Sequence, residues 1–339
     1  MTIPPVPPPA PQTTTAAPPR RRSALGSLFL LVFLAALLAG AAAIIALVVP
    51  GPMTEKKIVV IPAQLGLRGI GAALMEQGLV YHPLQFTLPA KLLEADNLKP
   101  GEYEFRPQMS VLDIIAQLRA GKTIVHKITI PEGLTNGDIA RLLEAEPLLT
   151  EPVGTLPPEG ALYPATYNFS YGDRRPQFIA QMSKLAQSTL QELWGKRAAD
   201  LPLQTPQQAA VLASIVEKET GVADERARVA GVFYNRLRLG MRLQSDPTVI
   251  YALTLGKTPF KRSLTSADLA FPSPYNTYAV TGLPPAPIAN PGRAALQAVL
   301  QPEKHDFLYF VADGSGGHAF AKTLEEHNRY VAQWRKLKR

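Results

Sequence analysis

The feature of this sequence that most limits its fold is an apolar run over residues 24–49, which contains no charged residue. At ~1.5 Å rise per residue, a helix of this length measures about 39 Å, more than the ~30 Å hydrocarbon core of a bilayer. Three arginines at 20–22 precede the run, whereas Lys56 and Lys57 lie several positions beyond its end. Because basic residues collect on the cytoplasmic side, we expect a single transmembrane helix with a cytoplasmic N-terminus. A cleaved secretory signal is the alternative, but its apolar core would be shorter.

Composition narrows the chemistry of the remaining chain. Residues 1–23 are rich in proline and predict a disordered cytoplasmic tail. The chain has no cysteine and only five scattered histidines, so we expect no metal site and no thiolate nucleophile. The formal net charge is +8, but the basic residues form no groove pattern with aromatic residues, so nucleic acid is not an expected partner. Anionic membranes and an anionic cell-wall polymer remain open as partners.

The pattern after the apolar run predicts a small α+β subdomain over residues 53–123. A β-branched run predicts a strand at 57–61, and apolar periodicity predicts a helix at 67–79. A second strand is expected at 101–105 and a second helix at 111–118. Strand and helix in this arrangement are typical of a LysM-like module, which would bind glycan; a spacer domain is an equally open interpretation.

Residues 124–339 predict a second, larger domain of mixed α+β type. Alternating apolar residues predict a strand at 124–130, and helical periodicity is found at 178–194 and 224–237. A further strand is expected at 307–312, followed by a tight turn and a C-terminal helix. The fold class is therefore α+β throughout.

One acidic residue of this second domain lies where an acid is not expected. Thr205-Pro206-Gln207-Gln208 predicts a helix start, and the helix continues to about Thr220. Projected at about 100° per residue, Glu219 falls near the middle of the apolar face, whereas Glu217 falls at its edge. A carboxyl held among apolar neighbours keeps its proton near neutral pH, as a general acid must. The alternative is that Glu219 lies at a frayed helix end and pairs with an arginine; the candidates are Arg226, Arg228 and Arg236.

Loops after this helix concentrate amides, hydroxyls and tyrosines, which suit the apolar faces and hydroxyl rim of a sugar. The candidate substrate-binding residues are Glu217, Asn235, Gln244, Asp246, Tyr275, Asn276 and Tyr278. For the two tyrosines, packing in the core remains an alternative. Asp246 precedes a proline, so a turn-capping role is its alternative.

Several blocks in order carry a resemblance to a known family. They are residues 213–220, 232–237, 240–249, 275–278, 282–285 and 309–314. With these blocks the sequence resembles the endolytic murein transglycosylase family, also called MltG or YceG-like. The resemblance covers nearly everything after the apolar run. One departure is that the family usually has aspartate where this chain has Ala165, so a role for that aspartate in substrate contact is in doubt here.

The resemblance implies a single-pass enzyme of the bacterial inner membrane, with a LysM-like subdomain and a periplasmic catalytic domain of lytic-transglycosylase type. Glu219 corresponds to the family's catalytic acid. The implied reaction cleaves the β-1,4 bond between N-acetylmuramic acid and N-acetylglucosamine, forms 1,6-anhydromuramyl ends and limits the length of nascent strands. It needs no cofactor, and peptidoglycan synthases are a further partner that the family implies.

Two other functions remain open from the residues alone. A muramidase would need a second carboxyl near Glu219, for which Glu217 and Asp246 are the candidates. A non-catalytic glycan-binding module would need none.

Overall fold

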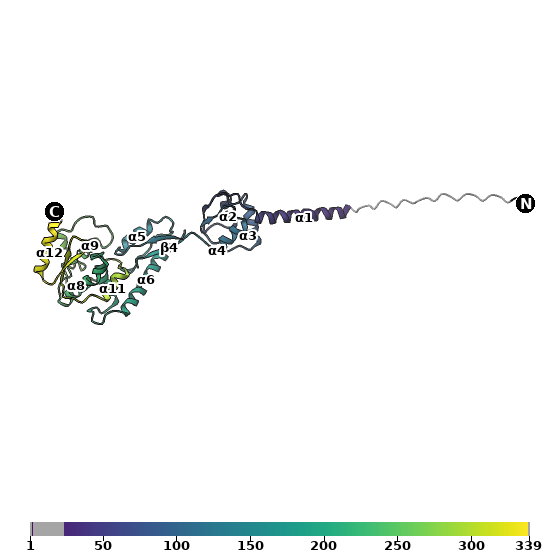
Figure 1. Ribbon diagram of the computed structural model, residues 1–339. Helices are drawn as coiled ribbons and strands as arrows, with labels where there is room; N and C mark the ends of the chain where they lie inside the picture. Colours follow the sequence, from purple (N-terminus) through teal and green to yellow (C-terminus); the bar gives the residue numbers. More distant parts are fainter. Residues whose placement is uncertain (1, 3–23, 338–339) are drawn as a thin grey trace. The chain divides into compact units, whose positions relative to one another are not determined.

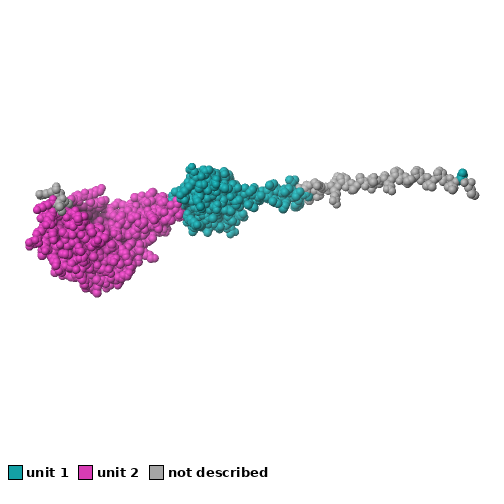
Figure 2. All heavy atoms as spheres, in the orientation of Figure 1, with its two compact units in different colours: residues 1–122 teal, residues 123–339 magenta. Residues whose placement is uncertain are grey.

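The computed structural model describes residue 2 and residues 24–337. The chain divides into two compact units, Met1–Lys122 and Thr123–Arg339, which Figure 2 distinguishes by colour. The sequence predicts a boundary after residue 123. Helices and short two-stranded sheets occur in both units, so the mixed α+β class is confirmed (Figure 1).

Helix α1 (Ala24–Val48) coincides closely with the predicted apolar helix. Large apolar side chains along it are exposed, among them Phe29 and Leu38. Within the part of the chain that the structure describes, no helix is both long enough and apolar enough to cross a membrane. The predicted membrane span is not confirmed and stays a prediction. The predicted disordered tail at 1–23 lies outside the described residues, apart from residue 2.

The first unit is built on one antiparallel strand pair. Strands β1 (Lys57–Ile61) and β2 (Gly101–Phe105) have the bounds that the sequence predicts, and Ile61 lies opposite Gly101. Helices α2 (Leu67–Glu76) and α3 (Pro83–Leu92) lie between them in the sequence, and α4 (Val111–Ala120) follows. The core joins alternate strand residues to one face of each helix; its largest members are Ile61, Leu74, Leu79, Phe86, Tyr103, Phe105, Ile114, Ile115 and Leu118.

Helix α3 is missing from the sequence prediction. Its N-cap is His82, whose ring accepts a hydrogen bond from the N–H of Leu84. Pro89 lies inside the helix, and only Phe86 and Ala90 are buried. The sequence therefore has no continuous apolar stripe that would predict this helix. The structure therefore has a second helix between the two predicted strands that the sequence pattern does not predict. The LysM-like character of this unit stays a prediction.

The second unit opens with another antiparallel pair, β3 (His126–Thr129) and β4 (Thr166–Phe169). Helix α5 (Asn136–Glu144) follows β3, and α6 (Arg175–Gly195) follows β4. Thr135 caps α5, because its hydroxyl accepts from the N–H of Asp138 and the Asp138 carboxylate accepts from the N–H of Thr135. These elements enclose a core of their own.

The rest of the second unit surrounds helix α7 (Pro206–Glu219). Thr205 caps it as predicted, and the helix ends one residue before the predicted Thr220. Neighbours of α7 along the chain are a 3₁₀ turn (Ala223–Glu225), α8 (Arg226–Arg238), α9 (Asp246–Thr254), α10 (Ser266–Leu269) and α11 (Arg293–Leu300). Helices α6, α8, α9 and α11 all pack against α7.

A hairpin and a helix complete this unit. Strands β5 (Tyr309–Ala312) and β6 (His318–Ala321) pair antiparallel, and α12 (Leu324–Leu337) packs against both. The strand begins two residues later than predicted. Thr323 and Glu326 cap α12, since the Thr323 hydroxyl accepts from the N–H of Glu326.

Asn290 ties three distant segments of the second unit together. It is fully buried, at 0% exposure. Its side-chain amide donates to the carbonyl of Leu134 and to Oδ1 of Asn136, each at 2.9 Å, and its own Oδ1 accepts from the N–H of Leu162 at 2.7 Å. The loop before α11 is therefore fastened to the start of α5 and to the loop before β4.

We predict that Asn290→Ala lowers the free energy of unfolding by about 3 kcal/mol, because buried partners lose their hydrogen bonds at once. Urea denaturation of the two proteins measures the difference. Asn168→Ala, at an exposed position of β4, is the control and is expected to change stability by less than about 0.5 kcal/mol. Equal losses in the two variants would contradict the assigned role of Asn290.

Candidate active site

Glu219 is the last residue of α7 and is carried into the interior of the second unit by the residues before it. Ile215 and Val216 in the preceding turn are fully buried. Thr220 takes an extended conformation, with φ −136° and ψ 129°, and ends the helix. Since the helix cannot rotate without exposing its apolar residues, the carboxyl of Glu219 is held against neighbouring elements. Glu219 itself is half-buried.

A pocket of about 430 Å³ opens beside this carboxyl. Helices α7, α8, α9 and α12, strand β5 and the loops around 243 and 278 all contribute to its wall. The lining residues are Glu219, Arg236, Leu243, Gln244, Asp246, Tyr278, Tyr309, Phe310, Val311, Leu324 and His327. Two tyrosine rings and a phenylalanine ring stand beside polar groups, a combination that suits a sugar.

Burial raises the pKa of Glu219 from its ordinary value of 4.5 to about 7. The nearby Asp246 carboxylate raises this pKa as well, whereas the Ser245 hydroxyl and the charges of His318 and Arg236 lower it. The Ser245 hydroxyl donates to Oε1 of Glu219 at 2.5 Å. Among the ion pairs of the described residues, none joins Glu219 to an arginine. A large share of molecules therefore keeps the Glu219 proton near neutral pH.

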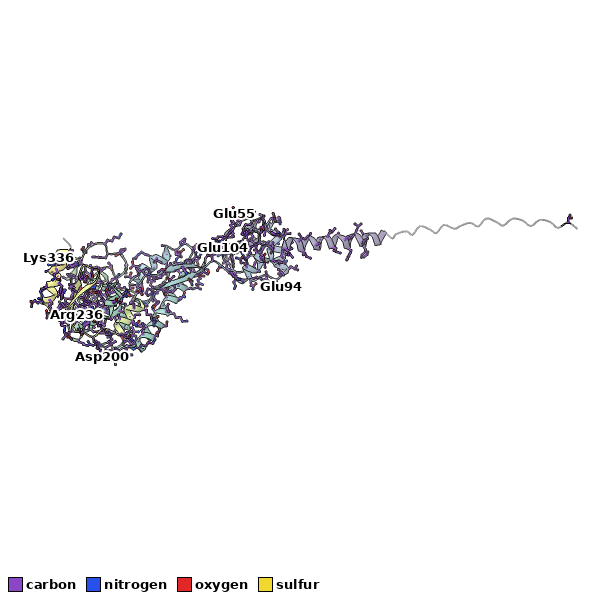
Figure 3. All side chains as sticks on the ribbon, viewed as in Figure 1. Glu55, Glu94, Glu104, Asp200, Arg236 and Lys336 are labelled. Carbon is purple, nitrogen blue, oxygen red and sulfur yellow. The ribbon has the colours of Figure 1, made fainter. Side chains whose placement is uncertain are left out.

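Arg236, which Figure 3 labels, lines the pocket. In the part of the chain that the structure describes, no ion pair joins it to a carboxylate. It is only 7% exposed, and burial lowers its pKa. Its Nε donates to the carbonyl of Leu308 at 2.6 Å, and its Nη1 donates to the carbonyl of Leu243 at 2.8 Å. The guanidinium thus joins the chain before β5 to the chain before α9, and both segments form pocket wall.

Three predicted substrate-binding residues lie in the same pocket as Glu219: Gln244, Asp246 and Tyr278. The Tyr278 hydroxyl donates to Oδ1 of Asp246 at 2.6 Å. Burial, then the bond to Asp246, raises the pKa of Tyr278, so the phenol keeps its proton. Gln244 has a left-handed backbone, with φ 52°. Among the described residues, no cluster of three or more acidic or histidine side chains has a geometry fit for a metal ion.

Two predicted substrate-binding residues, Asn235 and Asn276, lie outside this pocket. Asn276 is fully buried; its amide donates to the carbonyls of Leu269 and Phe271, and its Oδ1 accepts from the N–H of Tyr278. Asn235 donates to backbone carbonyls ahead of β5 and does not line the pocket. Both side-chain amides donate to backbone carbonyls, and Asn276 is closed to solvent whereas Asn235 is half-buried.

Glu217 and Tyr275 also lie outside the pocket. The Glu217 carboxylate accepts from the N–H of Gly292 at 2.9 Å, and burial raises its pKa. The ring of Tyr275 packs against that of Tyr251, with centroids 4.9 Å apart. Tyr275 therefore packs against the core, which was the alternative considered for the two tyrosines, whereas Tyr278 lines the pocket.

Four residues beside Glu219 were not among the predicted site residues: Ser245, Arg236, Tyr309 and His327. Ser245 and Arg236 stand inside the sequence blocks noted above, next to Gln244 and Asn235, and that adjacency was a usable signal. Tyr309 begins the block 309–314, but no local pattern connects the C-terminal hairpin and helix, which carry Tyr309 and His327, to Glu219. The ring of His327 stacks on that of Tyr309 at 5.3 Å.

The YceG-like family model matches residues 59–333, which include the first unit from β1 onward, almost all of the second unit and every residue that lines the pocket. A solved structure of a yceG-like protein from Listeria monocytogenes is 34% identical to this chain. The match covers 81% of this chain and 98% of that one, with a TM-score of 0.52.

Two bacterial relatives named endolytic murein transglycosylase are also similar. The Bacillus subtilis protein is 32% identical over 305 residues, which are 79% of this chain and 82% of the relative. The Streptococcus pneumoniae protein is 31% identical over 333 residues, with 84% of this chain matched. The chain spans only 60% of the length of that pneumococcal relative.

We predict that Glu219 makes the fold less stable as the pH rises. Its pKa is about 7 when folded and near 4.5 when exposed, so the folded chain binds more protons between these values. The free energy of unfolding therefore falls as the pH rises through this window, by at most about 3 kcal/mol. Glu219→Gln removes the titrating group and should be more stable than wild type above pH 7. Urea denaturation from pH 4 to 8 measures the difference, and a difference that stays constant over this range would refute the assignment.

Proposed function

The chain belongs to the YceG-like family, and on that premise we propose that it is an endolytic peptidoglycan transglycosylase with Glu219 as its catalytic acid. The observation that carries the proposal is a carboxyl whose pKa is raised to about 7, in a pocket lined by aromatic rings and hydrogen-bonding groups. A carboxyl that keeps its proton near neutral pH can act as a general acid. The names of the Bacillus and Streptococcus relatives support the same substrate.

The proposed step needs one carboxyl because the nucleophile belongs to the substrate. Protonated Glu219 donates its proton to the glycosidic oxygen as the bond from that oxygen to the anomeric carbon of N-acetylmuramic acid breaks. The resulting carboxylate accepts the proton of the muramyl 6-hydroxyl, whose oxygen bonds to the anomeric carbon. The products are a 1,6-anhydromuramyl end and a free 4-hydroxyl on N-acetylglucosamine. Glu219 ends the cycle protonated, and no water is consumed.

The walls of the pocket support recognition of a sugar near Glu219. The rings of Tyr278 and Tyr309 offer apolar faces, and Gln244 offers an amide with both a donor and an acceptor. The Asp246 carboxylate, which accepts a hydrogen bond from the Tyr278 hydroxyl, can stabilise the positive charge that develops at the anomeric carbon.

Asp246 also gives one specific reason to keep a muramidase as the second candidate. It places another carboxyl in the same pocket as Glu219, as a glycoside hydrolase requires. The two reactions differ in their products, because a hydrolase leaves reducing ends and a transglycosylase leaves anhydro ends.

We predict that Glu219→Gln lowers the rate of strand cleavage by a factor on the order of 10²–10⁴, since the amide has no proton to transfer. Mass spectrometry of purified glycan strands after incubation measures both the rate and the type of end. Glu217→Gln is the matched control on the same helix; it lies outside the pocket, keeps an acceptor for Gly292 and should cleave normally. Reducing ends from the wild-type chain would favour the muramidase, and an active Glu219→Gln would exclude Glu219 as the acid.

We also propose that the reaction takes place on the outer side of the inner membrane, where it limits the length of nascent strands. The support is the sequence pattern, with arginines at 20–22 before the apolar run at 24–49, together with the location of the substrate outside the cytoplasm. Glycan binding by the first unit and contact with peptidoglycan synthases belong to the same proposal.

If the second unit lies outside the membrane, protease added to intact spheroplasts should degrade it, because the protease reaches only the outer surface of the membrane. Immunodetection of the C-terminal helix measures the loss, and a cytoplasmic marker protein serves as the control. Full protection of the second unit until the membrane is dissolved would overturn the proposed orientation.

A further inference from the structure

A chain of buried hydroxyls lies behind the carboxyl of Glu219. Ser245 is 1% exposed, and Thr248 and Thr277 are both fully buried. The N–H of Ser245 donates to Oγ1 of Thr277 at 2.9 Å, and the hydroxyl of Thr248 donates to the carbonyl of Ser245 at 2.6 Å. The backbone of Ser245 is thus fixed on both sides of its side chain.

Each hydroxyl carries a single hydrogen, so the direction of the remaining bonds can be assigned. Thr248 gives its hydrogen to the carbonyl of Ser245, and therefore the 2.8 Å contact between the two threonine hydroxyls has Thr277 as its donor. Neither threonine has a hydrogen left for Ser245. Among the hydrogen bonds of the described residues, the one acceptor for the Ser245 hydroxyl is Oε1 of Glu219 at 2.5 Å.

We propose that Ser245 is a positioning residue of the reaction, which holds Oε1 of Glu219 with its hydroxyl and so leaves Oε2 as the oxygen that exchanges the proton with substrate. An oxygen that accepts this bond is the carbonyl oxygen of the protonated acid. The transferable proton is then on Oε2. Ser245 touches no reacting atom and acts through Glu219.

The hydroxyl next to Glu219 in the sequence does not take this role. Thr220 is buried, and its Oγ1 accepts from the N–H of Val222 at 3.0 Å. The hydroxyl that contacts the acid comes instead from Ser245, 26 residues later. Thr220 is the neighbour of Glu219 in the sequence, but the hydroxyl that donates to the Glu219 carboxyl is that of Ser245, which the fold brings to it.

Electrostatics agree with the geometry. A hydrogen bond to the ionised form lowers a carboxyl pKa, and the bond from Ser245 acts on Glu219 in this direction. Tyr278, Tyr309 and His327 face the same pocket. Three charged groups act on the Glu219 pKa: Asp246 at the start of α9 raises it, and His318 on β6 and Arg236 on α8 lower it. Removal of the serine hydroxyl leaves these three in place, so the Glu219 pKa should rise.

The proposal rests on the proposed function, and its test is Ser245→Ala in the full chain. Without the hydroxyl the carboxyl can turn, and we expect single-turnover cleavage to slow by about ten- to a hundredfold. Cleavage needs protonated Glu219, so activity declines as the pH rises through its pKa. In Ser245→Ala this alkaline limb should move to higher pH. An unchanged rate with an unmoved limb would overturn the proposal.

Ser214→Ala is the matched control. Ser214 is a fully buried serine on α7 that donates to the carbonyl of Val211 and accepts from the N–H of Ile288, without contact to Glu219. We expect it to lose stability, to keep its rate within about twofold and to keep its alkaline limb. If Ser245→Ala only loses stability in the same way, its role is structural and the proposal fails. Should Ser245→Ala not fold, Ser245→Cys keeps the volume with a weaker donor, and the same shift of smaller size is expected.

A second readout does not depend on activity. Titration of the Glu219 carboxyl by NMR, with ¹³C-labelled glutamate and Glu219→Gln to identify its signal, should give a higher pKa in Ser245→Ala than in wild type. An equal pKa in the two proteins would contradict the contact itself. Absence of anhydro ends from wild type, with the NMR shift present, would overturn the proposed function and leave the contact intact.

Discussion

The pocket depends on one constraint, which is that the carboxyl of Glu219 is carried into the protein by a helix that cannot turn. The residues of α7 before it are buried among α6, α8, α9 and α11. Rotation of the helix to expose the acid would expose Ile215 and Val216 as well, at about 1.5–3 kcal/mol for each side chain. The hydrophobic core therefore decides the protonation state of the acid, since burial is the largest influence on its pKa.

Arg236 shows how a buried charge can serve a site without pairing to its acid. Its guanidinium donates to the carbonyl of Leu243, in the segment before α9, and to that of Leu308, in the segment before β5. An ion pair with Glu219 would have kept that carboxyl ionised and removed its use as an acid. Because Nε and Nη1 of Arg236 donate to backbone carbonyls instead, the positive charge of Arg236 only moderates the rise in the Glu219 pKa.

The sequence predicts those parts of the site that follow from local pattern. The helical projection selects Glu219 over Glu217, and the structure places Glu219 in the pocket and Glu217 outside it. The sequence does not show whether an amide in a loop faces a substrate or the loop itself. The Asn276 amide, for example, donates to the carbonyl of Leu269, although the same group could bind a sugar hydroxyl. His327 has no local signal, since only the packing of α12 on the hairpin brings it to the pocket. Helix α3 is not predicted either, because only two of its residues are buried and its apolar stripe is too short to give a helical pattern.

The hydrogen bonds of Asn276 explain how the Tyr278 ring is held at the pocket. Asn276 accepts from the N–H of Tyr278 while it anchors the preceding loop, and this fixes the backbone from which the Tyr278 ring projects. The Tyr278 hydroxyl in turn fixes the Asp246 carboxylate. Polar groups that are already held by protein need little reorganisation when charge develops on a substrate, and such preorganisation is where enzymes gain most of their electrostatic stabilisation. Asn276, which lies outside the pocket, thus determines the arrangement of Tyr278 and Asp246 inside it.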